Sequence, residues 1–143
     1  HLSLVAKDYD YIIIDCPPSL GLLNLNALCA ADSVIIPVQC EYYAMEAVAQ
    51  ILSSISKIQK EYNPNLEILG FLLTMYDSRI KLATEVTTEI RGLFREKTFI
   101  TQIPRNISLA EAAFYGKPIN MFRPKATGSL AYLSLAREII SNE

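Results

Sequence analysis

Short continuous runs of apolar residues are the feature that most constrains the fold of this chain. They occupy residues 11–14 (YIII), 33–38 (SVIIPV), 68–74 (ILGFLLT) and 98–103 (TFITQI). Continuous rather than alternating hydrophobicity is typical of strands covered on both faces, as in parallel sheets. We therefore expect four strands of a parallel sheet with helices packed on both sides.

Between these runs, apolar residues recur every three or four positions, which is the spacing of one helical face. The pattern predicts helices over residues 44–62 and 82–94, and a C-terminal helix that includes residues 130–140. Strands and helices therefore alternate, which predicts an α/β fold with right-handed crossovers. The chain, residues 1–143, contains no internal repeat or linker and is interpreted as one domain or part of one.

A further short helix is expected between the fourth run and the C-terminal helix. Ser108 and Glu111 form a Ser-x-x-Glu sequence, which is typical of a capping box and predicts a helix through residues 110–115. Gly116, followed by a lysine and a proline, is expected to end it.

The composition excludes several classes of protein. The chain is 51% hydrophobic and 20% charged, as expected for a globular domain, and no apolar run is long enough to span a membrane. Cys16, Cys29 and Cys40 form no C-x-x-C pair and are interpreted as reduced, buried thiols of a cytosolic protein. His1 is the only histidine, so a Ser-His-Asp triad or a histidine-rich zinc site has no internal histidine to use.

The net charge of −2 conceals an asymmetry between the two halves of the chain. Residues 1–78 carry three basic and nine acidic side chains, whereas residues 79–143 carry ten basic and six acidic side chains. A mildly basic C-terminal half is compatible with a phosphate-bearing partner, and equally with an ordinary solvated surface.

Polar side chains follow each predicted strand, at residues 15–19, 39–41, 76–79 and 104–106. Ligands of open parallel sheets bind beyond the carboxyl ends of the strands, so we expect these residues to converge on a site. Asp15 is the most specific candidate for a metal-binding residue, because P-loop NTPases place a Mg²⁺-binding carboxylate after a buried strand. A solvated aspartate or a cap for the next segment is the alternative.

Several of these segments resemble the ParA/Soj family of chromosome and plasmid partition ATPases. Residues 9–21 (YDYIIIDCPPSLG) are similar to its Walker B segment. The resemblance continues through residues 37–46 (PVQCEYYAME) and 72–79 (LLTMYDSR), and resumes at 103–106 (IPRN), 108–112 (SLAEA) and 116–119 (GKPI). Several motifs in the right order are far more specific than any one of them.

The resemblance implies a P-loop NTPase fold of the deviant-Walker type, here as an incomplete domain. Proteins of this family form a dimer on MgATP, and the dimer binds duplex DNA without sequence preference. A centromere-binding ParB-type partner then stimulates hydrolysis. A cytoplasmic, nucleoid-associated protein with no membrane attachment is therefore expected.

The resemblance also implies roles for individual residues. Asp15 would bind Mg²⁺ through a water. The implied nucleotide-binding residues are Asp15, Pro17, Pro18, Met75, Pro104, Arg105 and Asn106. The implied switch and dimer residues are Ser19, Gly21, Glu41 and Glu46. The implied DNA-binding residues are Arg79, Lys81, Arg105 and Lys117.

The sequence departs from the family pattern in two ways. It contains no K-G-G-x-G-K-T phosphate loop and lacks the family's catalytic aspartate. We interpret residues 1–143 as the C-terminal half to three-fifths of a family member, unable to bind or hydrolyse ATP alone. Relatives commonly carry a basic residue at the position of Ser108, which makes DNA binding less secure than the family resemblance implies.

Other branches and classes remain as alternatives. MinD-type division-site ATPases use a basic amphipathic membrane helix at the C-terminus, but here the tail from residue 130 holds only Arg137 as a cation. The nitrogenase iron-protein branch needs cluster-ligating cysteines, for which Cys16 has no obvious partner. A scaffold that has lost its phosphate loop is the non-enzymatic alternative.

Overall fold

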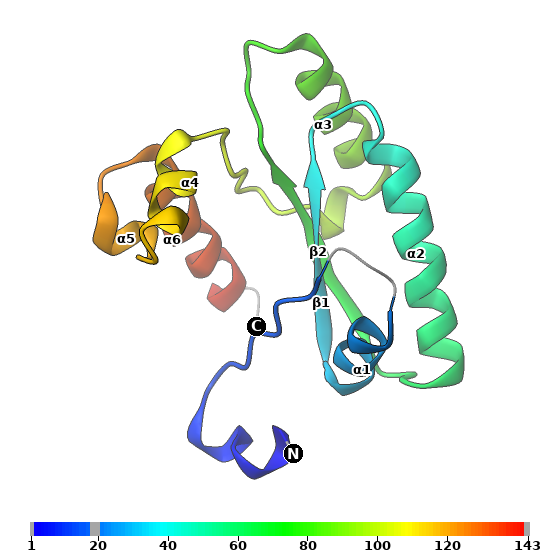
Figure 1. Cartoon of the computed structure of the whole chain (residues 1–143). Coiled ribbons are helices and arrows are strands. Elements are labelled where there is room, and N and C mark those ends of the chain that lie inside the picture. The colour runs from blue at the N-terminus through cyan, green and yellow to red at the C-terminus, as the bar shows by residue number, and fades with distance from the viewer. Residues whose placement is uncertain (1, 18–20, 142–143) are drawn as a thin grey trace.

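The computed structural model describes residues 2–17 and 21–141, drawn in Figure 1. Strands and helices alternate along the first part of the chain, and the rest is helical. The described elements are η1 (Leu2–Leu4), η2 (Ala6–Asp8), α1 (Leu22–Ala30), β1 (Ser33–Gln39), α2 (Ala44–Glu61), β2 (Glu67–Thr74), α3 (Lys81–Leu93), η3 (Arg95–Lys97), α4 (Ile107–Phe114), α5 (Ile119–Phe122) and α6 (Thr127–Ser141).

The centre of the fold is a parallel pair of strands, β1 and β2. Ser33 pairs with Glu67 at one end and Gln39 pairs with Thr74 at the other, with one irregularity between Val34 and Ile35. The crossover between the two strands is α2, which lies along the sheet in Figure 1. A helical crossover is the connection that parallel strands require. The predicted strands at 33–38 and 68–74 are thus confirmed.

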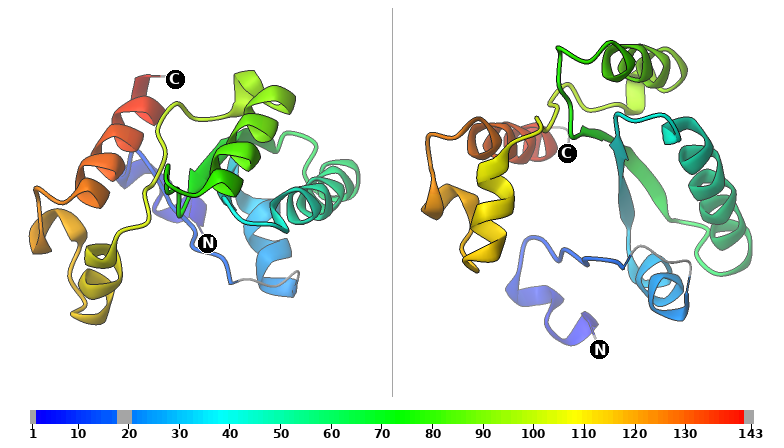
Figure 2. Two further views of the ribbon diagram at one scale, coloured as in Figure 1. Left: turned by 90° about the horizontal axis from the view of Figure 1, so that it is seen from above. Right: turned by 45° about the horizontal axis from the view of Figure 1, so that its top comes forward.

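Both faces of this strand pair are covered, as the continuous apolar runs predict. On one face, Phe71 and Leu73 pack with buried residues of α2 and α3, including Ile55 and Ile90. On the other face, Leu72 joins a second cluster with Phe99, Ile103 and Leu135. The views in Figures 1 and 2 show α1, α2 and α3 to one side of the strands and α4, α5 and α6 to the other. The chain therefore has the helix-flanked α/β architecture expected from its sequence.

The predicted helices at 44–62 and 82–94 are confirmed as α2 and α3. In α2, Val48, Ile55 and Ile58 are buried at helical spacing, and exposed polar residues fill the opposite face. Burial of such an apolar stripe supplies most of the stability of a helix this size.

The prediction of a first strand over residues 11–14 is wrong for the described structure. The segment forms no regular secondary structure and belongs to neither strand, and Ile13 is 91% exposed. A parallel strand obtains its ladder hydrogen bonds only from a neighbour, and β1 pairs with β2 alone in the part of the chain described here. The apolar pattern of residues 11–14 identifies a segment suited to burial, but it does not supply the neighbour.

The fourth predicted strand, residues 98–103, is confirmed only in part. Phe99 N donates to Phe71 O (3.1 Å) and Ile103 N donates to Leu73 O (2.9 Å), so the segment follows β2. Its two bridges, Thr98 to Phe71 and Pro104 to Tyr76, are isolated at its ends, and the residues between them form no strand.

Glu138 of α6 explains this interruption. Its carboxylate accepts hydrogen bonds from the backbone N–H groups of Ile100 and Thr101, while Arg91 donates to the carbonyls of Phe99 and Ile100. Burial raises the pKa of Glu138, but the hydrogen bonds from Thr101 and Ile100 and the charge of Arg91 outweigh it, and the net pKa lies below its usual value. Two charged side chains thus take the place of strand partners.

The predicted capping box is wrong. The helix α4 begins at Ile107, and its cap is Asn106, whose side chain accepts from Ser108 N at 2.8 Å. Ser108 lies inside the first turn, and Arg123 bonds both its hydroxyl and the Glu111 carboxylate at 3.0 Å. Asparagine caps a helix as well as serine does, and here Asn106, two positions before Ser108, is the N-cap.

The cysteine prediction is partly wrong. All three thiols are free, but only Cys40 is buried, whereas Cys16 and Cys29 are exposed. Cys16 lies in the irregular segment outside the sheet, and α1 leaves Cys29 on its uncovered side. Burial raises the pKa of the Cys40 thiol, and a contact with Thr87 partly offsets this.

Two glycines in open space provide a matched stability test. Gly116, which ends α4, has φ +60°, whereas Gly92 lies in α3, and an added Cβ meets nothing within 4 Å at either site. We expect Gly116→Ala to destabilise the fold by about 1 kcal/mol, because only glycine adopts this conformation without strain. Gly92→Ala should stabilise it by about 0.5–1 kcal/mol, since alanine is the better helix former. Urea unfolding of both variants checks this, and equal effects would contradict the conformational argument.

Candidate functional site

The loops that follow β1, β2 and Ile103 meet at one edge of the sheet, as the sequence predicts. Cys40 N donates to Thr74 O (3.2 Å), which ties the ends of β1 and β2 together. Tyr76 N donates to Ile103 O (3.1 Å), and Arg105 N donates to Tyr76 O (2.9 Å). Three segments far apart in the sequence therefore present their polar residues on one surface.

An ion pair joins two of these loops. Arg105 Nη2 lies 3.1 Å from Glu41 Oε1, and both side chains are about half exposed. Glu41 follows β1, whereas Arg105 follows the segment that runs beside β2. The pair is partly solvated, so we expect it to orient the two loops more than it stabilises the fold.

Met75 adopts a backbone conformation that is rare for a residue with a side chain. Its φ is +53°, and it directly follows β2 at the edge where the loops meet. Conformations of this kind persist where the surrounding structure determines them, and they cluster at ligand-binding sites. The neighbouring backbone bonds of Cys40 and Tyr76 hold both sides of this turn.

Asp77 and Arg79 are joined by three hydrogen bonds at this edge. Arg79 donates from Nε to Oδ1 (2.9 Å) and from Nη2 to Oδ2 (2.7 Å), and its backbone N–H also reaches Oδ1 (3.0 Å). The side-chain and then the backbone hydrogen bonds of Arg79, with its charge, lower the pKa of Asp77 to about 2. Sequence reasoning places Asp77 in this loop without a role, although the Asp-x-Arg spacing of residues 77–79 is the signal for the pair.

Asp15 and Pro17 take part in none of the backbone hydrogen bonds that join the loops at this edge. Both belong to the exposed, irregular segment before α1, which Asn24 ties down by donating to Pro17 O at 2.9 Å. Gly21 directly precedes α1 in an extended conformation. The predictions for Pro18 and Ser19 fall outside the described residues.

Three further predicted residues lie at exposed positions, in α2, in α3 and after α4. Glu46 is in the first turn of α2 and accepts from Gln50, at 3.4 Å. Lys81 begins α3 and pairs with Glu85 at 3.4 Å. Lys117 follows α4 and donates its backbone N–H to Ala112 O (2.9 Å).

The metal-binding prediction concerns a single carboxylate. Across residues 2–17 and 21–141, no three His, Cys, Asp or Glu side chains gather into a group that could hold a metal ion. Mg²⁺ commonly binds one or two carboxylates together with substrate phosphates and waters. The Mg²⁺-binding role of Asp15 through a water therefore stays a prediction.

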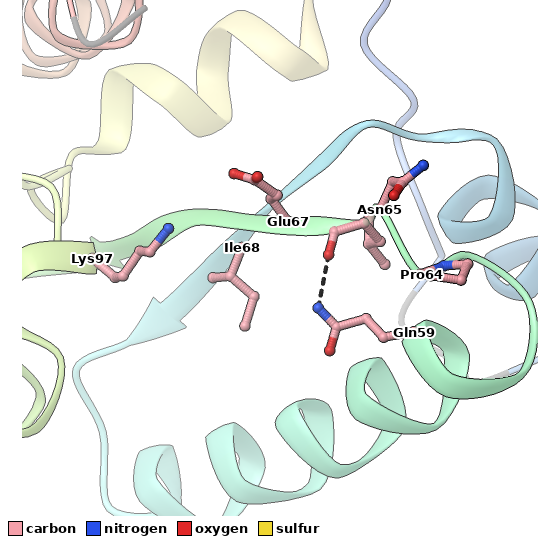
Figure 3. Close-up of a pocket in the computed structure, with 7 residues that line it drawn as sticks. Gln59, Pro64, Asn65, Glu67, Ile68 and Lys97 are labelled. Carbon is pink, nitrogen blue, oxygen red and sulfur yellow. Dashed lines mark hydrogen bonds between the residues drawn. The ribbon is translucent and has the colours of Figure 1, made fainter.

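A cavity of about 780 Å³ lies at the opposite end of β2, where the strand begins (Figure 3). Gln59 points from α2 toward the strand and donates to Leu66 O at 2.7 Å. Glu67, Ile68 and Lys97 line the same hollow. Because it lies at the amino end of a parallel strand, it is not where ligands of such sheets bind.

Comparison with known proteins connects this arrangement to a fold class. A family described as "AAA domain" matches residues 1–68. A solved structure of cobyrinic acid a,c-diamide synthase from Mycobacterium smegmatis, with bound ATP analog and magnesium, has a TM-score of 0.78 and 38% identity, covering 95% of this chain and 49% of that one. The cell division ATPase MinD of Pyrococcus furiosus has a TM-score of 0.76 at 23% identity, covering 99% of this chain and 56% of that one. The chain thus has a P-loop NTPase-like α/β fold, as a partial domain.

Curated relatives narrow the class further. The sporulation initiation inhibitor protein Soj of Bacillus subtilis is 52% identical over 141 residues, which is 99% of this chain and 56% of the relative. The chromosome partitioning protein ParA of Myxococcus xanthus is 50% identical over 142 residues, 99% of this chain and 50% of the relative. The chain is a homologue of the ParA/Soj chromosome-partitioning ATPases, and it spans about half the length of the relatives it matches.

The pH dependence of stability tests the Asp77–Arg79 pair. A carboxylate with a lowered pKa stabilises the folded state above its unfolded value, near 3.8, and this contribution is lost as the pH falls toward 2. We therefore expect Asp77→Asn to lower Tm at pH 7 and to leave it close to the wild-type value at pH 2. Thermal unfolding of both proteins between pH 7 and pH 2 measures this. A Tm difference that stays constant over this range would contradict the pairing.

Proposed function

We propose that residues 1–143 are the C-terminal portion of a ParA/Soj-type partition ATPase. In this proposal the protein forms a dimer on MgATP, the dimer binds duplex DNA without sequence preference, and a ParB-type partner stimulates hydrolysis. The observation that carries the proposal is about 50% identity to partition proteins over 99% of the chain. Because the chain spans about half of those relatives, the activity is proposed for the longer protein.

Nucleotide binding is proposed for the residues around the carboxyl edge of the sheet. The backbone bonds among Tyr76, Ile103 and Arg105, and the turn at Met75, support an adenine contact there. The solved relatives with bound ATP analog or ADP and magnesium support nucleotide use in this fold. The proposed nucleotide-binding residues are Asp15, Pro17, Pro18, Met75, Pro104, Arg105 and Asn106. The proposed switch and dimer residues are Ser19, Gly21, Glu41 and Glu46.

A DNA-binding surface is proposed for Arg79, Lys81, Arg105 and Lys117. The side chains of Arg79 and Lys81 are 88% and 92% exposed, so their charges are accessible to phosphates. Contacts of this kind neutralise phosphates, release counterions and carry no base preference.

A cytoplasmic, nucleoid-associated location is part of the same proposal. It follows from the proposed DNA partner and from the partitioning names of the relatives. Among the residues described, no helix combines the length and apolar character needed to cross a membrane.

Two other functions are distinguishable from this one. A MinD-like division-site ATPase has the same fold, which the archaeal MinD structure supports at the level of architecture alone. A scaffold without a phosphate loop would bind neither nucleotide nor DNA in a nucleotide-dependent way. The identity of the curated relatives favours partition over both alternatives.

DNA retention under different nucleotides tests the proposed function. A protein that carries this chain at the full length of its relatives should remain on random-sequence duplex DNA with MgATP and be released with MgADP. Retention should weaken with salt, with a slope of roughly one per phosphate contact. Equal retention with both nucleotides, or none with either, would contradict the partition function.

The chain alone is expected to be inactive. Without backbone amides and a lysine to hold the phosphates, purified residues 1–143 should release no phosphate from MgATP above the uncatalysed rate. A malachite-green assay measures this, with the longer protein as the positive control. Sustained phosphate release from the 143-residue chain would contradict the proposal that ATP hydrolysis requires the longer protein.

A further inference from the structure

Asp77 accepts three hydrogen bonds from a single residue, Arg79. Two come from the guanidinium, at 2.9 and 2.7 Å, and one comes from the backbone N–H, at 3.0 Å. The two side-chain bonds form a bidentate pair, the geometry that fixes the plane of a guanidinium as well as its position. The backbone bond fixes the turn from which the arginine side chain starts.

The two partners differ sharply in exposure. The Asp77 side chain is only 12% exposed, whereas that of Arg79 is 88% exposed. The backbone beside Asp77 is held by Tyr76, whose N–H donates to Ile103 O and whose carbonyl accepts from Arg105 N. The carboxylate is therefore an anchored, inner group, and the guanidinium extends outward from it.

This arrangement leaves one edge of the guanidinium available. An arginine has five N–H donors, and Asp77 uses one at Nε and one at Nη2. The two donors of Nη1 and the second donor of Nη2 remain, and the Nη1–Nη2 edge is a fork that matches two oxygens of a phosphate.

We propose that Asp77 is a positioning residue for phosphate binding, which holds Arg79 with its Nη1–Nη2 edge directed at a backbone phosphate of duplex DNA. The inference rests on the proposed DNA-binding function and deepens it. It assigns a favourable role in DNA binding to a negatively charged residue, which long-range electrostatics alone would call unfavourable.

The Lys81–Glu85 pair on α3 offers a matched comparison. It is a single contact of 3.4 Å between side chains that are 92% and 58% exposed. Such a pair has no bidentate geometry and both of its side chains are largely exposed, so Glu85 neutralises charge without orienting Lys81. Asp77→Asn and Glu85→Gln make the same change in net charge, and they differ in whether an oriented arginine is lost.

The test measures retention on random-sequence duplex DNA over a salt series with MgATP. The protein is again the one that carries this chain at the full length of its relatives. Asp77→Asn keeps an oxygen for the backbone N–H of Arg79 but loses the charge, and Asp77→Glu keeps the charge but moves it. We expect both to weaken retention about three- to tenfold, the cost of ordering one long side chain on binding. Glu85→Gln should leave retention equal or stronger.

The salt dependence separates positioning from a structural effect. Arg79→Gln should lower the salt slope by about one, and the Asp77→Asn/Arg79→Gln double variant should bind no more weakly than Arg79→Gln alone. Stronger or unchanged retention by Asp77→Asn, or additive losses in the double variant, would overturn the inference while leaving the proposed function intact. If the wild type shows no nucleotide-dependent retention, both fail together. Circular dichroism confirms that each variant is folded.

Discussion

The parallel pairing of β1 with β2 is the interaction on which the rest of this structure depends. Parallel strands end at the same edge, so their pairing brings the loops after Gln39 and Thr74 together. The crossover helix α2 must then cover one face, and α6 with its neighbours covers the other. The segment after residue 97 follows β2 and delivers Arg105 to the same edge. The candidate site is therefore a consequence of strand direction more than of any single side chain.

The sequence correctly predicts β1, β2, α2 and α3, each of which pairs or packs with another described element. The runs that became β1 and β2 find each other as neighbours, and the stripes of α2 and α3 find the sheet. Residues 11–14 have the same apolar pattern, but pairing is a property of two segments and the pattern describes one. The cap of α4 fails for a different reason, because Asn106 and Ser108 are both good caps and the local sequence does not rank them.

The position of the candidate site could be predicted from the sequence, but the ion pairs that its arginines form could not. The residues after the strands were expected to meet, and the loops after β1, β2 and Ile103 do so. A list of cations, however, does not reveal that Arg105 pairs with Glu41 and Arg79 with Asp77. These two arginines therefore contribute little net charge at this edge. In the proposed DNA-binding role, the orientation of their remaining donors would therefore matter more than total charge.

The way in which Glu138 and Arg91 hold residues 99–101 also makes the two sides of the sheet unequal. On the β2 side, the backbone groups that another strand would seek are already bonded to charged side chains, which blocks further pairing. On the β1 side, the described residues add no third strand. The sheet therefore ends at residues 99–101, where a further strand would find no free backbone partners.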